Sequence, residues 1–594
     1  MPISLEMRRH SAAHVMAAAL QRLFPDAKFG VGPAIEHGFY YDVDLSRPLT
    51  TEDLTRIQET MATIVKENPA FTREELAIDE AIALFQGLGQ VYKVELLTDL
   101  KTKGTTAVKD VGDEFDAASV NSVTVYRTGS FVDLCRGPHV ETANQIGAVK
   151  LTKIAGAYWR GKESNPQLQR VYGWCFATQE ELDAHVKMVE EAEKRDHKKL
   201  GPELDLFTFS DLVGPGLPLW TPRGTLLRNL LDTYVWELRQ RHGYMRVEIP
   251  HITKKELYIT SGHWDKYKDD LFRVVTREGH EFAMKPMNCP HHTQIYARKL
   301  WSYRELPQRY ANTTTCYRDE QSGELSGLSR TRAFAQDDAH VFCRMSQVKE
   351  EFLHIWKIVY EFYGSFGFNL RVRLSLHDPA HPEKYLGDPE RWALAEGMLR
   401  DIAKEQGADA FDGIGEAAFY GPKMDFMAKD SLGREWQVAT IQLDMNMPER
   451  FDLVCVNEAG ERERIVMIHA AIMGSIERFL SIAIEHFGGS FPLWLAPTQV
   501  LVASVADRFA EPMHEIAKWL QASGMRVEID DSSESVGKKI RKAEQMKIPV
   551  TLVIGEKEAS GQPFMVRVRG EEAQHTLDRE QLLAFLRERI QSKK

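Results

Sequence analysis

The most informative pattern of hydrophobic and polar positions lies between Cys316 and Cys343. A polar opening leads into a loop rich in Gly and Ser, and the chain then returns as an alternating run that ends in apolar residues. This order predicts a strand, a loop and a second, antiparallel strand. A period of two predicts that one face of the returning strand carries Arg330, Arg332, Phe334, Gln336 and Asp338.

The polar side chains of this hairpin suit a planar, anionic ligand. Arginine side chains bind phosphate oxygens through paired N–H donors, and a Phe ring can stack on a base whose edge bonds to Glu or Gln. A surface hairpin with ordinary ion pairs is the competing interpretation. The clustering of these residue types on one strand face favours a nucleotide site.

The hydrophobic pattern changes several times along the chain, which predicts a multidomain α+β protein. A chain of 594 residues is too long for a single core, so three or four domains are expected. The pattern places them at residues 1–177, 178–202, 203–495 and 496–594. The second begins with the capping-box sequence Thr178-x-x-Glu181 and is predicted to be a charged helical linker that ends at Gly201-Pro202.

The two C-terminal domains differ in pattern. A long amphipathic run from Gly216 to Tyr244 predicts a helix that stops at Gly243, and VEIPHI (residues 247–252) predicts a strand after it. From about Pro497 the chain changes to short elements. LVASV, MRVEID, VTLVI and FMVRVR read as strands with helices between or after them, which predicts an α/β domain with a mixed sheet.

The first domain carries a second group of candidate functional residues. His10 and His14 are four residues apart in an apolar helical pattern, so both imidazoles are predicted on one helix face. Cys135 and His139 follow in a turn-rich context. These are the ligand types of a tetrahedral zinc site, and a hydrolytic pocket without metal or a set of core histidines are the alternatives. The polar segment at residues 102–122 is predicted to be a surface excursion.

Composition excludes some classes of protein. Hydrophobic residues make up 43% and charged residues 27% of the chain, which is typical of a soluble globular protein. No run approaches the length of a membrane span, and the start has no apolar signal core, so we expect a cytoplasmic protein without membrane association. The net charge of −11 predicts that any RNA contact uses local patches. The scattered Cys residues favour free thiols or a metal ligand over disulfides.

The hairpin carries a resemblance to a known family. Arg318-x-Glu320, a loop and then Arg330-x-Arg-x-Phe334 resemble motif 2 of the class II aminoacyl-tRNA synthetases. The runs QDDAH (residues 336–340) and MKPMNCPHH (residues 284–292) narrow the resemblance to the threonyl-tRNA synthetases. It extends from about Met7 to the C-terminus, without the small ubiquitin-like domain that commonly comes first in that family. It implies an N-terminal α+β editing domain, a class II catalytic core on an antiparallel sheet, and a C-terminal α/β anticodon-binding domain.

The resemblance implies one zinc ion per subunit, bound by Cys289, His340 and His469. The contexts MNCPHH, DDAHVF and MIHAAIMGS match the family, although no two of these residues stand at the spacing of a sequence-local metal motif. One thiolate and two imidazoles leave the fourth zinc position open, which is the pattern of a catalytic site. In the family, threonine fills that position through its amino and hydroxyl groups.

The remaining site residues are also implied by the resemblance. Catalytic roles fall to Arg318, to Arg478 of motif 3 and to His263, and ATP is expected to bind with Mg²⁺. Contacts to threonine or ATP are implied for Glu320, Arg330, Phe334, Gln336, Asp338, Tyr420, Lys423, Gln437, Thr440 and Gln442. An editing pocket is implied for His10, His14, Tyr41, Lys93, Asp133, Cys135 and His139. Anticodon contacts are implied for Glu558 and Arg567.

A zinc site that recognises threonine by its hydroxyl group cannot fully reject serine, so a second site is needed to remove serine. Valine lacks the hydroxyl and can be rejected by about 10⁴-fold or more, whereas serine lacks only a methyl, worth about 10–200-fold. The resemblance therefore implies a threonine–tRNA ligase that also hydrolyses mischarged seryl-tRNA. In the threonyl family the editing pocket is described as working without metal.

The expected partners are threonine, ATP and threonine tRNA, and the helix and strand at residues 216–252 resemble motif 1, which implies a homodimer. A prolyl- or seryl-type relative is the alternative enzyme, but the zinc trio and the N-terminal histidine pair argue against it. A tRNA-binding paralogue without charging activity would be expected to lack Arg318, Arg478 or a zinc ligand. Two positions depart from the family pattern, namely Ala470, where Arg is common, and Ser533, where Asn is usual.

Overall fold

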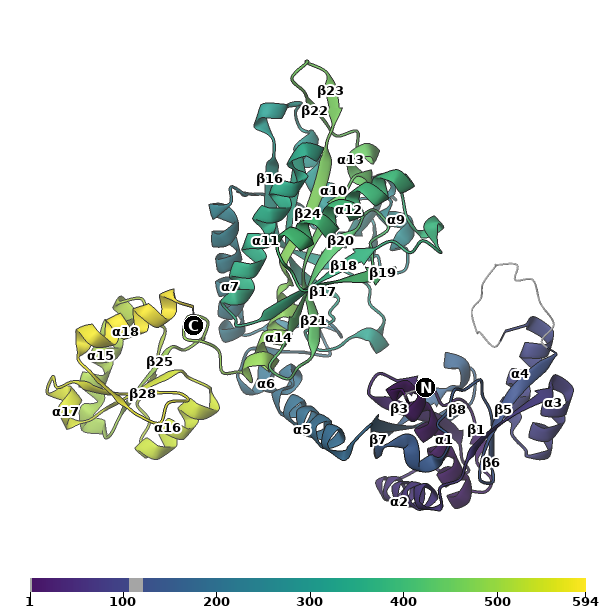
Figure 1. The fold of residues 1–594 in the computed structure, drawn as a ribbon. Helices are drawn as coiled ribbons and strands as arrows, with labels where there is room; N and C mark the ends of the chain where they lie inside the picture. Colours follow the sequence, from purple (N-terminus) through teal and green to yellow (C-terminus); the bar gives the residue numbers. More distant parts are fainter. Residues whose placement is uncertain (1–2, 106–120, 594) are drawn as a thin grey trace. The chain divides into compact units, whose positions relative to one another are not determined.

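The computed structural model describes residues 3–105 and 121–593, which form two compact units divided between Glu190 and Glu191 (Figure 1). The predicted surface excursion at residues 102–122 lies mostly outside the described residues. None of the described helices combines the length and the apolar character needed to cross a membrane.

The first unit is built on an antiparallel sheet with strand order β1-β3-β8-β7, and β2 pairs with β3. Helices α1 (Leu5–Leu23) and α2 (Thr51–Glu67) pack against it (Figure 1). Ser4 caps α1 by accepting a hydrogen bond from the Met7 N–H, and the apolar stripe of α1 enters the core with Phe39 of β3. The strands are β1 Lys28–Phe29, β2 Ala34–Ile35, β3 Gly38–Asp44, β7 Ala148–Tyr158 and β8 Gln167–Phe176.

A smaller sheet with order β4-β5-β6 completes the first unit, together with two helices. The bounds are β4 Phe71–Ala77, α3 Ile78–Gly87, α4 Val91–Lys103, β5 Ser122–Thr128 and β6 Phe131–Leu134. Lys93 lies on α4, Asp133 lies on β6 and Cys135 follows that strand directly. This sheet therefore brings three predicted site residues toward the larger sheet.

The predicted single linker helix is two helices, α5 (Gln179–Arg195) and α6 (His197–Glu203). Asp196 separates them because its backbone leaves the helical region and its side chain accepts the Lys198 N–H as an N-cap. The expectation that Gly201-Pro202 ends the helix is wrong, since both residues lie within α6.

The second unit contains the sheet with order β11-β16-β17-β24-β21-β20-β18-β19 (Figure 1). Its inner neighbours are antiparallel, and only the β11–β16 and β18–β19 pairs are parallel. The antiparallel sheet expected for this domain from the sequence is confirmed. The strands are β11 Met245–Arg246, β16 Gln308–Tyr317, β17 Ala333–Cys343, β18 Asn369–Leu376, β19 Ala410–Ile414, β20 Lys423–Lys429, β21 Glu435–Asp444 and β24 Val466–Ser475.

The predicted helix near the start of this unit is α7 (Pro222–Arg241), which Thr221 caps. The predicted strand at residues 247–252 is wrong: the chain pairs briefly as β11 and again as β12 (Ile252–Lys254). Pro250 lies between the two and has no N–H to donate to a ladder, which is a physical reason for the interruption.

Helices cover one face of the large sheet. Apolar residues of α7 and of α11 (Val348–Gly364) join the core-facing side chains of β17, β21 and β24 in one continuous core. On β17 the core side carries Ala335, Ala339 and Val341, and the alternate residues Gln336, Asp338 and His340 face the opposite side. That opposite side is where the functional cavity forms.

A buried ion pair anchors the helix layer to the centre of the sheet. The Arg239 guanidinium of α7 lies 2.8 Å from Asp337 Oδ1 on β17, and both side chains are at most 2% exposed. Asp337 Oδ2 accepts the N–H groups of Ile472 and Met473 on β24, beside the bulge in the β17–β24 ladder. Arg239 also donates to the carbonyl of Asp338. The pair therefore fixes the bulge that directs Asp338 into the cavity.

Smaller elements surround the large sheet. Two three-stranded sheets have the orders β12-β14-β13 and β15-β22-β23, and β9 pairs with β10. The bounds are β9 Phe207–Thr208, β10 Leu219–Trp220, α8 Lys255–Ser261, α9 His263–Lys266, β13 Arg273–Val275, β14 Glu281–Met284, α10 Cys289–Ala297, β15 Trp301–Ser302, α12 Pro389–Glu405, α13 Asn446–Arg450, β22 Val454–Val456, β23 Arg462–Arg464 and α14 Ile476–Phe487.

The C-terminal part has the mixed α/β sheet expected, with order β26-β25-β27-β28-β29. The pairs of β25 with β26 and β27 are parallel, and the pairs of β28 are antiparallel. Strand β29 and helix α17 were not predicted. The bounds are β25 Val500–Ser504, α15 Ala510–Ala522, β26 Val527–Asp530, α16 Val536–Gln545, β27 Val550–Ile554, α17 Glu556–Ala559, β28 Phe564–Val568, β29 His575–Leu577 and α18 Arg579–Gln591.

Replacing Arg239 with Met should destabilise the second unit strongly. The change leaves the Asp337 carboxylate buried without a counter-charge, which costs about 3–5 kcal/mol and should lower the thermal unfolding midpoint by roughly 10 °C. Circular dichroism during heating measures the midpoint. Arg241→Met is the matched control, because Arg241 makes a half-exposed ion pair with Glu361 that is worth at most about 1 kcal/mol. Equal midpoints for the two variants would contradict the anchoring role.

Candidate functional sites

A cavity of about 560 Å³ opens on the face of the large sheet opposite α7 and α11. The hairpin, strands β21 and β24 and the start of α14 contribute its walls. Most of the residues that sequence reasoning assigned to the catalytic site line this cavity, namely Cys289, Arg318, Glu320, Arg330, Phe334, Gln336, Asp338, His340, Tyr420, Gln437, Thr440, Gln442, His469 and Arg478.

The returning strand of the hairpin places alternate side chains in the cavity. Phe334, Gln336 and Asp338 all line it, as the period of two predicted. The predicted strand begins too early, because β17 starts at Ala333 and the two arginines precede it. Arg330 still lines the cavity, whereas the Arg332 guanidinium donates to the backbone carbonyl of Glu320. That contact orients the turn and removes Arg332 from the predicted face.

Two arginines of the cavity are free to bind an anion. Arg318 Nε is buried without a hydrogen-bond partner among the described residues, and its guanidinium lies 5.1 Å from the centre of the Phe334 ring. Arg478, in the first turn of α14, makes no side-chain hydrogen bond or ion pair with the described residues, and burial lowers its pKa. Arg330 differs, because it is paired with Glu320 at 2.7 Å and with Glu324 at 3.2 Å. The free pair can therefore compensate phosphate charge.

Cys289, His340 and His469 form a group that could hold a metal ion, with one ligand atom of each within 4.8 Å of the others. They come from α10, β17 and β24, and His340 and His469 face each other in the ladder. His340 Nε2 lies 3.1 Å from His469 Nδ1, and Asp444 Oδ2 lies 2.9 Å from His469 Nε2. A carboxylate on the far nitrogen orients a ligand histidine, so this donor set fits a zinc ion.

Sequence reasoning missed the residues behind Asp338. Lys285 is fully buried and donates to Asn288 Oδ1 at 2.9 Å and to Thr314 Oγ1 at 2.8 Å. Since the Asn288 oxygen faces this cation, its NH₂ group faces Asp338 Oδ2, at 3.1 Å. Burial raises the pKa of Asp338 to about 6. Lys285 stands in the MKPMNCPHH run, but sequence gives no sign of its burial.

A second missed residue is Asp425 on β20, which is fully buried. Its carboxylate accepts hydrogen bonds from Gln437 and Thr440, which line the cavity, and from Ser375. Lys423, predicted to bind substrate, lies outside the lining and is paired with Asp425 at 3.1 Å. An alternating strand pattern gives no signal for such a network, because its members come from separate strands.

His263 does not line the cavity either. Its ring is fully buried and stacks on Tyr267, and it lies 6.4 Å from the ring of Tyr420, which does line the cavity. Nδ1 lies 2.8 Å from Ser261 Oγ, whereas Nε2 has no partner among the described residues. Burial lowers the pKa of His263 to about 3, so the imidazole is neutral.

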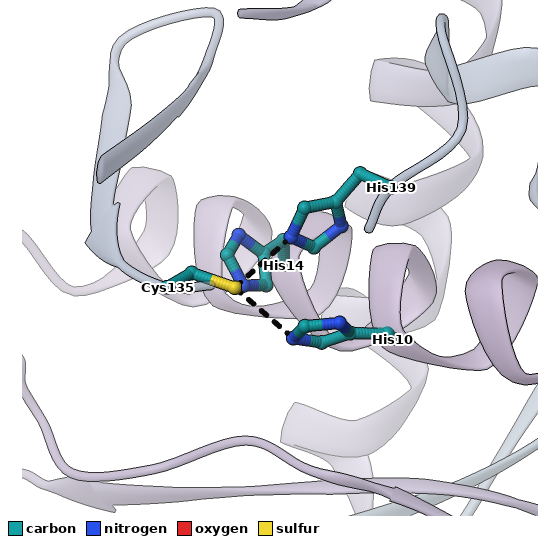
Figure 2. A group of neighbouring side chains, drawn as sticks. All are labelled: His10, His14, Cys135 and His139. Atoms are coloured by element: carbon teal, nitrogen blue, oxygen red, sulfur yellow. Dashed lines mark hydrogen bonds between the residues drawn. The ribbon is translucent and has the colours of Figure 1, made fainter. Parts of the chain in front are cut away.

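The first unit brings its predicted cluster together. Figure 2 shows the Cys135 sulfur between the rings of His10 and His139, with His14 beside them. The sulfur lies 3.2 Å from Nε2 of both His10 and His139, and one ligand atom of each of the four residues lies within 4.8 Å of the others. Ser11 Oγ bonds to His139 Nδ1 at 3.0 Å. Both a tetrahedral metal site and a metal-free pocket fit this geometry.

A buried polar network lies next to this cluster. Asp133 Oδ1 lies 2.5 Å from Lys93 Nζ, and Oδ2 accepts the Tyr41 hydroxyl and lies 3.4 Å from His14 Nε2. All four side chains are at most 3% exposed. The structure therefore brings all seven predicted residues of this pocket to one place.

Burial keeps the reactive groups of the first unit neutral. It lowers the pKa of His10 and, further, of His14, and it lowers the pKa of His139 to about 2. It raises the pKa of the Cys135 thiol to about 11. At neutral pH the imidazoles are unprotonated and weakly basic, so they can accept a hydrogen bond from water.

The predicted anticodon residues lie in the C-terminal part. Arg567 on β28 lines a cavity of about 280 Å³ between α16, β27 and the turn at residues 569–574. Glu558 is outside this lining, and its carboxylate accepts the Gly555 N–H at 3.0 Å to cap α17. Arg567 therefore borders a cavity that could hold part of a ligand, whereas the Glu558 carboxylate is used in a hydrogen bond within its own helix turn.

Comparisons with known proteins match each part of the chain. The model described as "tRNA synthetase class II core domain (G, H, P, S and T)" matches residues 272–487, and "Anticodon binding domain" matches residues 499–589. "Threonyl and Alanyl tRNA synthetase second additional domain" matches residues 123–172. The first match contains the hairpin and the metal-ligand group, and the last contains Cys135 and His139.

Relatives named threonine–tRNA ligase match nearly the whole chain. That of Porphyromonas gingivalis is 47% identical over 567 residues, which cover 95% of this chain and 84% of the relative. That of Gloeobacter violaceus is 47% identical over 600 residues, covering 99% and 93%. The solved RNA binding domain of threonyl-tRNA synthetase from Cryptosporidium parvum Iowa II aligns with a TM-score of 0.63 and 37% identity, covering 66% of this chain and 98% of that one.

Proposed function

Because this chain belongs to the threonyl-tRNA synthetase family, we propose that it activates threonine with ATP and transfers the threonyl group to the 3′ end of threonine tRNA. The observation that carries the proposal is one cavity that holds a thiol and two imidazoles at metal-binding distance together with two arginines free for phosphate. That combination suits an amino acid at one end and a nucleoside triphosphate at the other.

The residues of the cavity support adenylate formation by charge compensation. The threonine carboxylate attacks the α-phosphorus of ATP, and pyrophosphate leaves. Arg318 stands beside Phe334, where it would compensate charge on the α-phosphate while the ring stacks on the base. Arg478 would bind the outer phosphates, and Mg²⁺, when bound with ATP, supplies further charge neutralisation. His263 stays a prediction for the transfer step, because it lies outside the cavity lining.

The metal-ligand group would hold one zinc ion through Cys289, His340 and His469. Bound zinc supplies a Lewis-acid position that a hydroxyl and an amino group can occupy. Asp444 holds the His469 ring in place, and Asp338 presents its carboxylate nearby. These residues orient an amino acid whose side chain carries a hydroxyl, so valine is rejected while serine is only partly rejected.

The first unit would then hydrolyse seryl-tRNA. His10, His14 and His139 are neutral and can accept a hydrogen bond from a water molecule, and the Lys93–Asp133–Tyr41 network fixes the pocket wall. Water positioned by an imidazole or by the ribose hydroxyl of the substrate would attack the ester. A pocket sized for serine would exclude or misplace threonine through its extra methyl.

Two further interactions belong to the proposal. Helix α7 and the chain after it resemble motif 1, and this resemblance supports a homodimer. The C-terminal α/β part would bind the anticodon, with Arg567 as a contact because it borders a cavity, whereas Glu558 remains a weaker prediction because its carboxylate already caps α17.

ATP–pyrophosphate exchange tests the activation step. Wild-type protein should catalyse exchange with threonine and far less with the other amino acids. Arg318→Ala or Arg478→Ala should lower it by roughly 10²-fold or more, because each removes a donor to the transition state, while tRNA binding should change little. Arg400→Ala, at an exposed ion pair with Asp412, is the control. Normal exchange by Arg318→Ala would refute its role.

Elemental analysis tests the metal. We expect about one zinc per chain, and Cys289→Ser should lose the metal and reduce threonine-dependent exchange by more than about 100-fold. Cys455→Ser, at a buried thiol on β22, should keep both. Full activity with clearly substoichiometric zinc would overturn the assignment. Two zinc ions per chain would show that the cluster of the first unit binds metal as well.

Deacylation of preformed seryl-tRNA tests the first unit. The His10→Ala/His14→Ala variant should charge threonine normally but accumulate seryl-tRNA, because the imidazoles that position the water are gone. His37→Ala, at an exposed histidine of the same unit, is the control. Clearance of seryl-tRNA at the wild-type rate would refute the editing assignment. A chelator should stop charging and spare deacylation, and loss of deacylation on chelation would favour the metal-dependent alternative.

A further inference from the structure

The tip of the cavity hairpin (residues 327–330) contacts both the end of the linker and helix α14. Ser329 and Arg330 of this tip line the cavity. Leu328 is only 1% exposed and belongs to the core of the second unit. Helix α6 packs against α14, whose first turn carries Arg478 (Figure 1). The linker therefore ends beside two of the elements that form the proposed ATP site.

His197, the first residue of α6, is buried and uses both ring nitrogens in hydrogen bonds. Its Nε2 accepts the backbone N–H of Leu328 at 3.0 Å. That bond leaves the ring proton on Nδ1, which donates to Glu485 Oε1 at 2.6 Å. The backbone N–H of His197 donates to the same oxygen at 3.2 Å. One imidazole thus connects the linker, the hairpin tip and α14.

Glu485 of α14 holds the imidazole in this tautomer. The carboxylate is buried, and its second oxygen lies 2.6 Å from Arg434 Nη2. A carboxylate paired with a guanidinium only accepts, so it keeps the ring proton on Nδ1 and leaves Nε2 as an acceptor. Asp196, His197 and Glu485 also lie close enough together to hold a metal ion. Both ring nitrogens already have partners in the protein, which favours a hydrogen-bonding role.

The contact between the linker and the hairpin tip requires a glycine at position 327. A Cβ at Gly327 would lie 2.3 Å from His197 Nε2 and 2.9 Å from Lys198 Cγ, which is too close for either contact. Gly327 also has a φ of +51°, in the left-handed region that favours glycine. A Cβ at Gly323, in the same loop, would meet no described atom within 4 Å. Of these two glycines, only Gly327 lies against the linker.

The tip is also bonded to the turn of α14 that carries Arg478. Ser481 Oγ donates to the carbonyl of Arg478 at 2.7 Å, so it accepts the hydroxyl of Ser329 at 3.0 Å. The tip is therefore held from two directions, by the linker imidazole through the Leu328 N–H and by α14 through Ser329. Arg330 follows directly, so its place in the cavity depends on both contacts.

We propose that His197 is a positioning residue for ATP, which holds the hairpin tip against α14 so that Ser329 and Arg330 keep their places in the cavity. The proposal rests on the proposed function. Loss of the acceptor would leave the buried Leu328 N–H unpaired, and the tip would move to satisfy it. The metal-ligand group lies on α10, β17 and β24, outside the tip. ATP binding should therefore weaken while threonine binding stays the same.

Exchange kinetics with ATP and threonine varied separately test the proposal. His197→Asn places an amide N–H where Nδ1 lies, so it keeps a donor to Glu485 and loses the acceptor for Leu328. It should raise the KM for ATP by about 10-fold or more and leave the KM for threonine unchanged. His197→Gln can place an amide oxygen where Nε2 lies, so it should restore most of the ATP affinity. An unchanged KM for ATP in folded His197→Asn, or equal values in the two variants, would overturn the proposal.

A pair of glycine variants covers poor folding of the His197 variants. Gly327→Ala forces the tip away from the linker and should raise the KM for ATP to a similar extent. Gly323→Ala is the matched control in the same loop and should leave it unchanged. A normal KM for ATP in Gly327→Ala, or a rise confined to the KM for threonine, would overturn the proposal. Absence of threonine-dependent exchange in the wild-type protein would instead refute the proposed function.

Discussion

A buried carboxylate and its single cation hold the centre of the catalytic sheet together. Asp337 points into the apolar layer beneath β17, where an unpaired charge would be very costly, and Arg239 of α7 compensates it. The same carboxylate binds two N–H groups of β24, so it connects the two strands that carry His340 and His469. The metal-ligand pair and Asp338 therefore owe their positions to a contact on the opposite face of the sheet.

The two candidate sites treat charge in opposite ways. Among the residues that the structure describes, Arg318 and Arg478 have no carboxylate partner, which suits a polyanionic substrate. The cluster of the first unit is neutral at physiological pH, because burial suppresses protonation of its imidazoles and ionisation of its thiol. One arrangement stabilises developing phosphate charge, and the other suits the positioning of a water molecule by neutral hydrogen-bond acceptors. This contrast follows from burial and pairing in each unit separately.

Sequence patterns predicted the elements better than the contacts between them. Alternation identified Phe334, Gln336 and Asp338 as one face of β17, and helical spacing identified the shared face of His10 and His14. Alternation failed at Arg332, because a backbone contact turned its side chain away.

Networks that join separate strands gave no local signal. Asp425 and Arg239 have partners on other strands, and Lys285 bonds to Thr314 as well as to nearby Asn288; nothing in the neighbouring sequence marks the three residues as buried. The resemblance implied a substrate contact for Lys423, and this role stays a prediction; in the structure its ammonium group lies 3.1 Å from Asp425, two residues along the same strand.

Strand β21 has a bulge at Val438, and this bulge affects how the sequence is aligned with related sequences. It makes the step from Gln437 to Thr440 three residues long, whereas the step from Thr440 to Gln442 is two. Deleting one residue here would look like a minor change of length, yet it would exchange the two faces of everything on the strand before it. An alignment gap placed one position away would match a core residue with a residue that lines the cavity. The register of this short segment thus carries information that residue identity alone does not.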